Sequence, residues 1–175
     1  MYLTYRTFST KRIDISRIKQ YSWMIEVAFS ILIIIVILNP AILSSLTGSQ
    51  APMAVVKGES MLPVLREGDI VFTYKPDPSE IRVGDVIVYK AYSNKLIIHR
   101  VVDVKIVNDK YYYVTKGDNN SGPDVIYFDV VNNRPLGISY DRVVGKVLSI
   151  NDVIVKIPYL GYISLWFQEI RSSLV

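Results

Sequence analysis

The sequence predicts a mainly β domain carried on one N-terminal transmembrane helix. Three observations lead to this prediction: an apolar run over residues 23–43 with Glu26 as its one charge, a series of short β-rich segments after Ala54, and turn-forming residues between those segments. About 20 apolar residues suffice to cross a bilayer as a helix. Many short strands favour a closed or partly closed barrel, because a barrel leaves few exposed edges.

Basic residues gather before the apolar run. Residues 1–20 hold five basic residues and one acidic residue, whereas the rest of the chain has 15 of each. Positive charge on this flank predicts a cytoplasmic N-terminus. We therefore expect a basic cytoplasmic tail over 1–20, a transmembrane signal-anchor helix over 21–46 and an extracytoplasmic β domain over 47–175. A helix packed on the core of a domain would need a polar face toward water, which residues 31–38 lack. A cleaved signal peptide would have a shorter apolar region.

The composition argues against several classes of function. Basic residues are not gathered on the folded body, as a nucleic-acid surface would require. The chain has no cysteine, which excludes disulfides, thiolate catalysis and cysteine-ligated zinc. It has one histidine, so a zinc site would depend on carboxylates, which suit zinc poorly. We expect no metal and no cofactor.

The β domain is predicted from strand-forming runs that are separated by turn residues. Helical periodicity is not expected after Ala54, residues 47–52 are interpreted as a linker, and 125–140 as a loop-rich insertion. The apolar C-terminal stretch 153–168 is expected to pack on the domain or to lie at the membrane interface. The predicted strands cover residues 53–56, 70–74, 85–90, 96–104, 111–116 and 143–150.

Ser60 lies where the first predicted strand has ended. Gly58 before it permits a close backbone approach, and Pro63 after it prevents the segment from continuing as helix or ladder. Such a serine is either an ordinary turn residue or a nucleophile. His99, in an apolar strand, is correspondingly either a satisfied core residue or a general base.

A third group of residues follows the strand 111–116. Asp118 and Asp124 lie in a turn rich in glycine and asparagine, which is a solvated loop, a calcium loop without the regular EF-hand spacing, or the source of a catalytic carboxylate. Serine, histidine and aspartate together provide what acyl transfer needs, and their order along the chain is no obstacle. Composition and spacing alone leave these alternatives open.

Five blocks of this sequence resemble type I signal peptidases, in the order in which that family has them. The resemblance covers the anchor and most of residues 50–165, and His99 stands where bacterial members carry lysine, so the chain is similar to the archaeal and endoplasmic-reticulum branch. The blocks are Gly58-Glu59-Ser60-Met61-Leu62-Pro63, Gly68-Asp69-Ile70-Val71, Val83-Gly84-Asp85-Val86-Ile87-Val88-Tyr89, Ile98-His99-Arg100-Val101 and Lys116-Gly117-Asp118-Asn119-Asn120.

The resemblance implies a catalytic set. Ser60 would attack the scissile carbonyl, His99 would act as general base, and of the two loop aspartates the spacing favours Asp124 as the partner of His99, with Asp118 supporting the architecture. The Ser60 backbone N–H would hold the oxyanion. Gly58 stands where bacterial relatives often place a serine, so a side-chain donor is missing there.

We place Gly58 and Met61 at the substrate and oxyanion end of the site. We also expect exposed apolar side chains beside it, with Met61, Leu62 and Val64 as the candidates, to dip into lipid.

The resemblance implies a membrane-bound serine endopeptidase that removes N-terminal signal peptides from secreted and membrane pre-proteins, cutting after small residues. Its partners would be pre-proteins, the lipid bilayer and the secretion translocon, with no nucleic acid, and its place the cell membrane. One alternative is a non-catalytic, membrane-anchored β-barrel that binds rather than cleaves. Another is a self-cleaving repressor-like protein, which would need a DNA-binding module and a base lysine.

Overall fold

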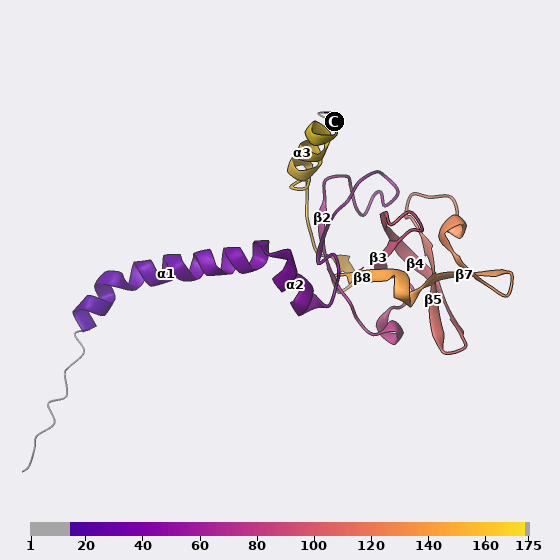
Figure 1. The fold of residues 1–175 in the computed structure, drawn as a ribbon, viewed down its shortest axis with the longest axis horizontal. Coiled ribbons are helices and arrows are strands. Elements are labelled where there is room, and N and C mark those ends of the chain that lie inside the picture. Colours follow the sequence, from indigo (N-terminus) through magenta and orange to yellow (C-terminus); the bar gives the residue numbers. More distant parts are fainter. Residues whose placement is uncertain (1–14, 174–175) are drawn as a thin grey trace, which may run out of the picture. The chain divides into compact units, whose positions relative to one another are not determined.

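The computed structural model describes residues 15–173, which divide after Asn39 into two units (Figure 1). The described part of the first unit is one helix, α1 (Ile15–Leu38), followed by Asn39. Residues 1–14 of the predicted basic tail lie outside the described residues. Residues 15–20, which were also assigned to that tail, belong to the helix instead.

The stretch 21–46 contains two helices in place of one, because α1 ends at Leu38 and a second helix, α2 (Pro40–Thr47), follows. Pro40 disfavours the helical conformation at Asn39 and brings no N–H of its own, whereas it fits the first position of a new helix. Among the described residues, no single helix is both long and apolar enough to cross a bilayer. Tyr21–Val36 and Pro40–Thr47 together have the length and composition of a bent span.

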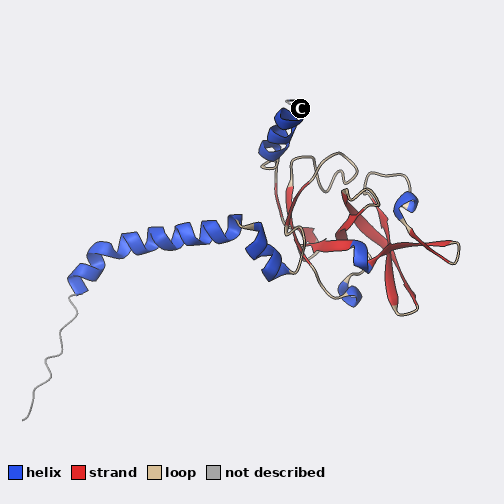
Figure 2. Cartoon of the chain, in the orientation of Figure 1, coloured by secondary structure: helices blue, strands red, loops and turns tan. Residues whose placement is uncertain are grey.

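The second unit is mainly β, as predicted, and consists of a curled antiparallel sheet with short helices at its margins (Figure 2). The sheet follows the order β1-β2-β8-β3-β4-β5-β7-β6, so it ends at β1 and β6 and does not close into a complete barrel. β11 (Lys156–Ile157) also pairs with β2, and β9 (Ser149–Ile150) forms a separate hairpin with β10 (Val153–Ile154). The other strands are β1 (Met53–Val55), β2 (Ile70–Tyr74), β3 (Val86–Lys90), β4 (Leu96–Val107), β5 (Lys110–Lys116), β6 (Asp129–Val131), β7 (Arg134–Ser139) and β8 (Val143–Val147).

All six predicted strands are confirmed, and the last of them divides into β8 and β9. The interpretation of 125–140 as a loop-rich insertion is wrong, because it contains the 3-10 turn η2 (Val125–Tyr127) and the hairpin β6–β7. Asn132 and Asn133 form the hairpin turn with φ of 52° and 58°. Asparagine tolerates this left-handed conformation, which a two-residue hairpin of this twist requires at both positions.

The C-terminal segment contains a helix, α3 (Tyr162–Ser173), where no helical periodicity was expected. Its large apolar residues Ile163, Trp166, Phe167 and Ile170 are spaced i, i+3, i+4, i+7, which is the pattern of one helix face. All four side chains are exposed.

The chain just before α3 is bound to the loop that carries Ser60. The Gly161 N–H donates to the Gly68 carbonyl at 2.8 Å, and Lys156 Nζ lies 2.6 Å from Asp69 Oδ2. Burial acts to raise the pKa of Asp69, but the hydrogen bonds from Lys156 and from the Arg66 N–H, with the lysine charge, hold that pKa below its ordinary value. The C-terminal segment therefore holds the end of the Ser60 loop, at Gly68 and Asp69.

Residues 47–52 are not a free linker. The Lys75 N–H donates to the Thr47 carbonyl at 2.9 Å, and the buried Ser49 hydroxyl lies 2.6 Å from Thr73 Oγ1. Buried hydroxyls find partners because an unpaired one would lose its hydration without compensation. The β unit therefore begins directly at the end of α2.

Candidate active site

The loop between β1 and β2 presents Ser60. Its ends are tied together, since the Val56 N–H donates to the Asp69 carbonyl at 2.9 Å and the Gly68 N–H donates to the Val56 carbonyl at 3.0 Å. Gly58 adopts φ +89°, a conformation that side chains disfavour, and it lets the chain turn before the serine.

Met61 anchors this loop from inside. Its side chain is 1% exposed and belongs to an apolar cluster with Leu65 and Val71. The expectation that Met61 is exposed and dips into lipid is therefore wrong, because the residue after Ser60 points into the core. Of the other two candidates, Val64 is exposed and Leu62 is half-buried.

His99 projects from β4 toward this loop. The strand pairs with β3, where Ile87 stands opposite His99, so the imidazole lies on the same face of the sheet as the core residues Ile87 and Tyr89. The histidine is 6% exposed. A fixed strand and close packing thus set the direction of the ring.

Ser60, His99 and Asp124 form a continuous chain of polar contacts. Ser60 Oγ lies 3.0 Å from His99 Nε2, and His99 Nδ1 lies 2.6 Å from Asp124 Oδ2. Asp124 is 6% exposed and occupies the turn between β5 and η2, where its backbone N–H donates to the Thr115 carbonyl at 2.9 Å. The arrangement can pass a proton from a hydroxyl to an imidazole that a buried carboxylate orients.

Asp118 takes no direct part in this chain of contacts. Its carboxylate receives two hydrogen bonds from Arg100, with Nε–Oδ1 and Nη2–Oδ2 both 2.7 Å. These hydrogen bonds raise the pKa of Arg100 above its ordinary value. The bidentate pair fixes the turn that follows β5 to the residue next to His99.

The same turn also contacts the loop that carries Ser60, which the sequence did not predict. The Asn119 N–H donates to the Ser60 carbonyl at 2.8 Å, and its side-chain amide donates to the Glu59 carbonyl at 3.2 Å. Gly117 packs so closely that a Cβ there would lie 2.6 Å from the Ser60 carbonyl oxygen. The backbone that carries the serine is therefore positioned by a segment nearly 60 residues further along the chain.

A groove of about 430 Å³ opens beside Ser60 and His99. In the described sheet, β4 pairs with β3 from Leu96 to Arg100 but with β5 only from Arg100 onward, which leaves one edge of 96–99 without a neighbouring strand. An extended peptide can pair with such an edge. The groove is lined by Ala54, Val55, Lys57, Gly58, Ser60, Val88, Lys95, Leu96, Ile97, Ile98, His99 and Tyr127.

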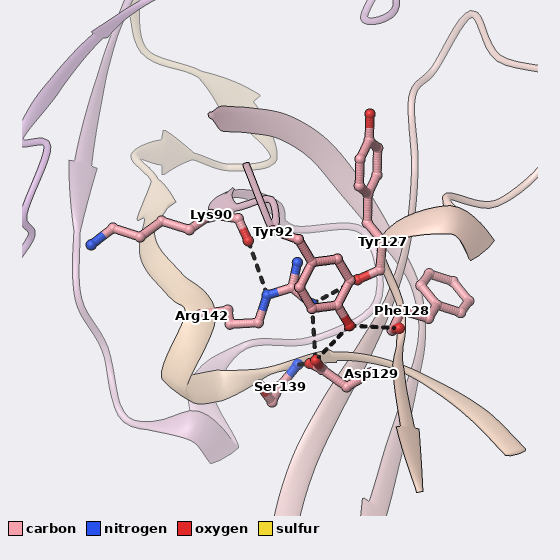
Figure 3. A network of polar contacts seen from close by, with 7 residues as sticks. All are labelled: Lys90, Tyr92, Tyr127, Phe128, Asp129, Ser139 and Arg142. Atoms are coloured by element: carbon pink, nitrogen blue, oxygen red, sulfur yellow. Dashed lines mark hydrogen bonds and ion pairs between the residues drawn. The ribbon is translucent and has the colours of Figure 1, made fainter. Parts of the chain in front are cut away.

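A second polar cluster lies around Arg142 and was not predicted (Figure 3). The guanidinium lies 4.2 Å from the centroid of the Tyr92 ring and donates through Nη1 to the Tyr127 carbonyl at 2.7 Å and to Asp129 Oδ1 at 3.0 Å. These contacts hold η2, the turn that directly follows Asp124. Within residues 15–173, no three histidine, aspartate or glutamate side chains gather so as to hold a metal ion.

Fold and site together define the class of the protein. A hydroxyl, an imidazole and a buried carboxylate joined in a line are the arrangement that serine peptidases use. Here they lie on a curled antiparallel sheet, and the Peptidase S24-like family model matches residues 30–129, which include all three side chains.

The relatives give the particular family. The chain is 35% identical over 131 residues to the signal peptidase complex catalytic subunit SEC11 of Lachancea thermotolerans, covering 73% of this chain and 72% of that protein. It is 34% identical over 126 residues to the subunit of the same name in Saccharomyces cerevisiae, covering 70% of each. The chain therefore belongs to the signal peptidases of the Peptidase S24-like family. It is a serine peptidase that removes signal peptides, as its sequence predicted.

Proposed function

We propose that Ser60 is the nucleophile, His99 the general base and acid, and Asp124 the carboxylate that orients the imidazole. One observation carries this proposal: the unbroken chain from Oγ to Nε2 at 3.0 Å and from Nδ1 to Oδ2 at 2.6 Å. A carboxylate at Nδ1 favours the tautomer protonated there, which leaves Nε2 free to accept the serine proton.

The reaction proceeds through an acyl-enzyme. As Oγ attacks the scissile carbonyl carbon, its proton passes to His99 Nε2, and the Ser60 backbone N–H stabilises the oxyanion, a contribution of about 3 kcal/mol in comparable sites. When the intermediate collapses, Nε2 returns the proton to the amine of the departing mature protein. Water then attacks the ester carbonyl and gives a proton to Nε2. As the bond between the carbonyl carbon and Oγ breaks, Nε2 passes that proton to Oγ, which restores the serine hydroxyl, and the signal peptide leaves with a free carboxyl group that ionises in water.

The substrate is proposed to lie in the groove as an extended strand along the free edge of 96–98. Its side chains then alternate between the sheet and solvent. The groove is lined mainly by apolar side chains, among them Val88 and Tyr127, which supports binding of small apolar residues at the cut. Pre-proteins emerging from the secretion translocon present such a segment.

Cleavage of a pre-protein in detergent or vesicles tests this function. We expect one product whose N-terminus, read by sequencing, follows a small residue, in line with the proposed preference at the cut. The matched control is the same pre-protein with phenylalanine at the residue before the cut, which should be cleaved at least about tenfold more slowly. Equal cleavage of both, or no cleavage of either, would contradict the proposal.

We also propose that the protein is a single-pass protein of the cell membrane with its N-terminus in the cytoplasm and its β unit outside. The basic residues before α1 and the apolar character of α1 and α2 support this. The exposed apolar face of α3, formed by Ile163, Trp166, Phe167 and Ile170, is proposed to lie in the headgroup region of the bilayer.

Single cysteines test this topology, because the chain has none of its own. In intact cells, a membrane-impermeant maleimide should label Ser93→Cys, in the exposed loop between β3 and β4, and should label Ser9→Cys only after permeabilisation. Phe167→Cys should be labelled slowly until detergent is added, because lipid covers that face. Labelling of Ser9→Cys in intact cells would show that the topology is the reverse of the one proposed. Fast labelling of Phe167→Cys would show that α3 does not lie in the membrane.

A further inference from the structure

Tyr89 reaches the carboxylate of Asp124 from β3, the strand that pairs with the strand of His99. It lies on β3, two residues from Ile87, which stands opposite His99, so Tyr89 and His99 are diagonal neighbours on one face of the sheet. Its hydroxyl donates to Asp124 Oδ2 at 3.1 Å. Oδ2 therefore receives both the imidazole N–H and the phenol O–H.

The Tyr89 ring is held rigidly. It is 0% exposed and makes edge contacts with the His99 ring at 6.5 Å and the Tyr127 ring at 6.3 Å between centroids. Burial raises the pKa of Tyr89 far above its ordinary value. The side-chain contact with Thr115 lowers that pKa, but by less than burial raises it. The phenol thus stays protonated and remains a donor at any working pH.

Asp124 itself has little support from its own element. It follows the strand β5 in a short turn, and its backbone is held by the Thr115 carbonyl and by the Tyr127 N–H. Within residues 15–173, Tyr89 and His99 are the side chains that hydrogen-bond to its carboxylate. Without a second contact, the carboxylate could rotate about its side-chain torsions and lose its alignment for the hydrogen bond with His99 Nδ1.

We propose that Tyr89 is a positioning residue for catalysis, fixing the Asp124 carboxylate so that it holds the His99 imidazole in line with Ser60. This inference rests on the proposed roles of His99 and Asp124. Tyr89 does not line the groove beside Ser60, so its effect should reach the rate of the chemical step and leave substrate binding unchanged.

Tyr89→Phe removes the hydroxyl and keeps the ring. We expect kcat to fall about tenfold at unchanged KM, the usual scale for one hydrogen bond to a charged group. The matched control is Tyr113→Phe, because Tyr113 is also 0% exposed and its hydroxyl donates to the Pro78 carbonyl, away from the site. Tyr113→Phe should lower the melting temperature at least as much as Tyr89→Phe and leave kcat unchanged.

The single histidine provides a measurement that would not change if Tyr89 only stabilised the fold. In protein labelled with ¹⁵N-histidine, one Nδ1–H resonance reports the hydrogen bond to Asp124. We expect Tyr89→Phe to shift this resonance and Tyr113→Phe to leave it in place. In an Asp124→Asn background, Tyr89→Phe should lower kcat by less than about threefold, because no carboxylate remains for the tyrosine to hold.

Two results would overturn the inference: wild-type kcat in Tyr89→Phe, or equal losses of kcat in the two phenylalanine variants. Failure of the proposed function would look different. If His99→Ala cleaved as fast as wild type, the roles of His99 and Asp124 would fall, whatever Tyr89→Phe did.

Discussion

Ser60→Ala is expected to leave a folded protein whose rate of pre-protein cleavage is lower by about four to six orders of magnitude. The alanine removes the Oγ that lies 3.0 Å from His99 Nε2, and with it the atom that we propose forms the acyl-enzyme. His99→Ala should cost about as much. Because the two groups act as one unit, the double variant should be no slower than either single variant.

Initial rates of cleavage, measured with pre-protein in excess, test this expectation. Ser121→Ala is the matched control, since it makes the same chemical change at an exposed serine in the turn before Asp124 and should cleave at the wild-type rate. Circular dichroism and thermal melting establish that each variant is folded. Wild-type cleavage by Ser60→Ala would refute the nucleophile assignment and favour a protein that binds pre-proteins without cutting them.

Gly117→Ala is expected to lower kcat about 100-fold without touching any of the three catalytic side chains. The added Cβ would lie 2.6 Å from the Ser60 carbonyl oxygen, a backbone atom, and 2.7 Å from Asn120 Nδ2. That carbonyl is also the acceptor of the Asn119 N–H. The peptide carrying Ser60 must therefore move, and a displacement of about 1 Å spoils both the approach to Nε2 and the direction of the oxyanion donor.

Gly122→Ala is the control for this substitution. It adds the same methyl group in the same turn, but no atom lies within 4 Å of the new Cβ, and the residue has no left-handed backbone conformation. It should cleave at the wild-type rate with an unchanged melting temperature. A Gly117→Ala variant with wild-type kcat would show that the nucleophile loop tolerates the displacement and that the turn does not position it.

The strands were predictable because their signals are local. Residues 70–74, 86–90 and 110–116 are runs of β-branched and aromatic residues between turn residues, and local propensity and burial favour the same state there. The hairpin β6–β7 was missed although Asn132 and Asn133 are its turn signal. Its strands are short, and Pro135 made a strand less probable than a loop.

The helices were less well predicted, for two different reasons. The apolar run 21–46 indicated one helix, but Pro40 ends α1 and begins α2, since a proline acts on the backbone whatever the hydropathy around it. In α3 the apolar residues had helical spacing, but Pro158 and Gly161 before it obscured the pattern.

By itself, the sequence determined the mainly β fold, the signal peptidase family and the candidate residues Ser60, His99, Asp118 and Asp124. It could do so because the motif blocks and the strand-forming runs are short, continuous stretches of the chain. Only the tertiary structure decided which aspartate lies against His99, that Met61 points into the core, and that Tyr89 contacts Asp124 and Gly117 packs on the Ser60 carbonyl. Those facts depend on strand register and on the packing of turns far apart in sequence. Distances of 2.6 to 3.1 Å between such residues are fixed by the folded sheet, and no local pattern encodes them.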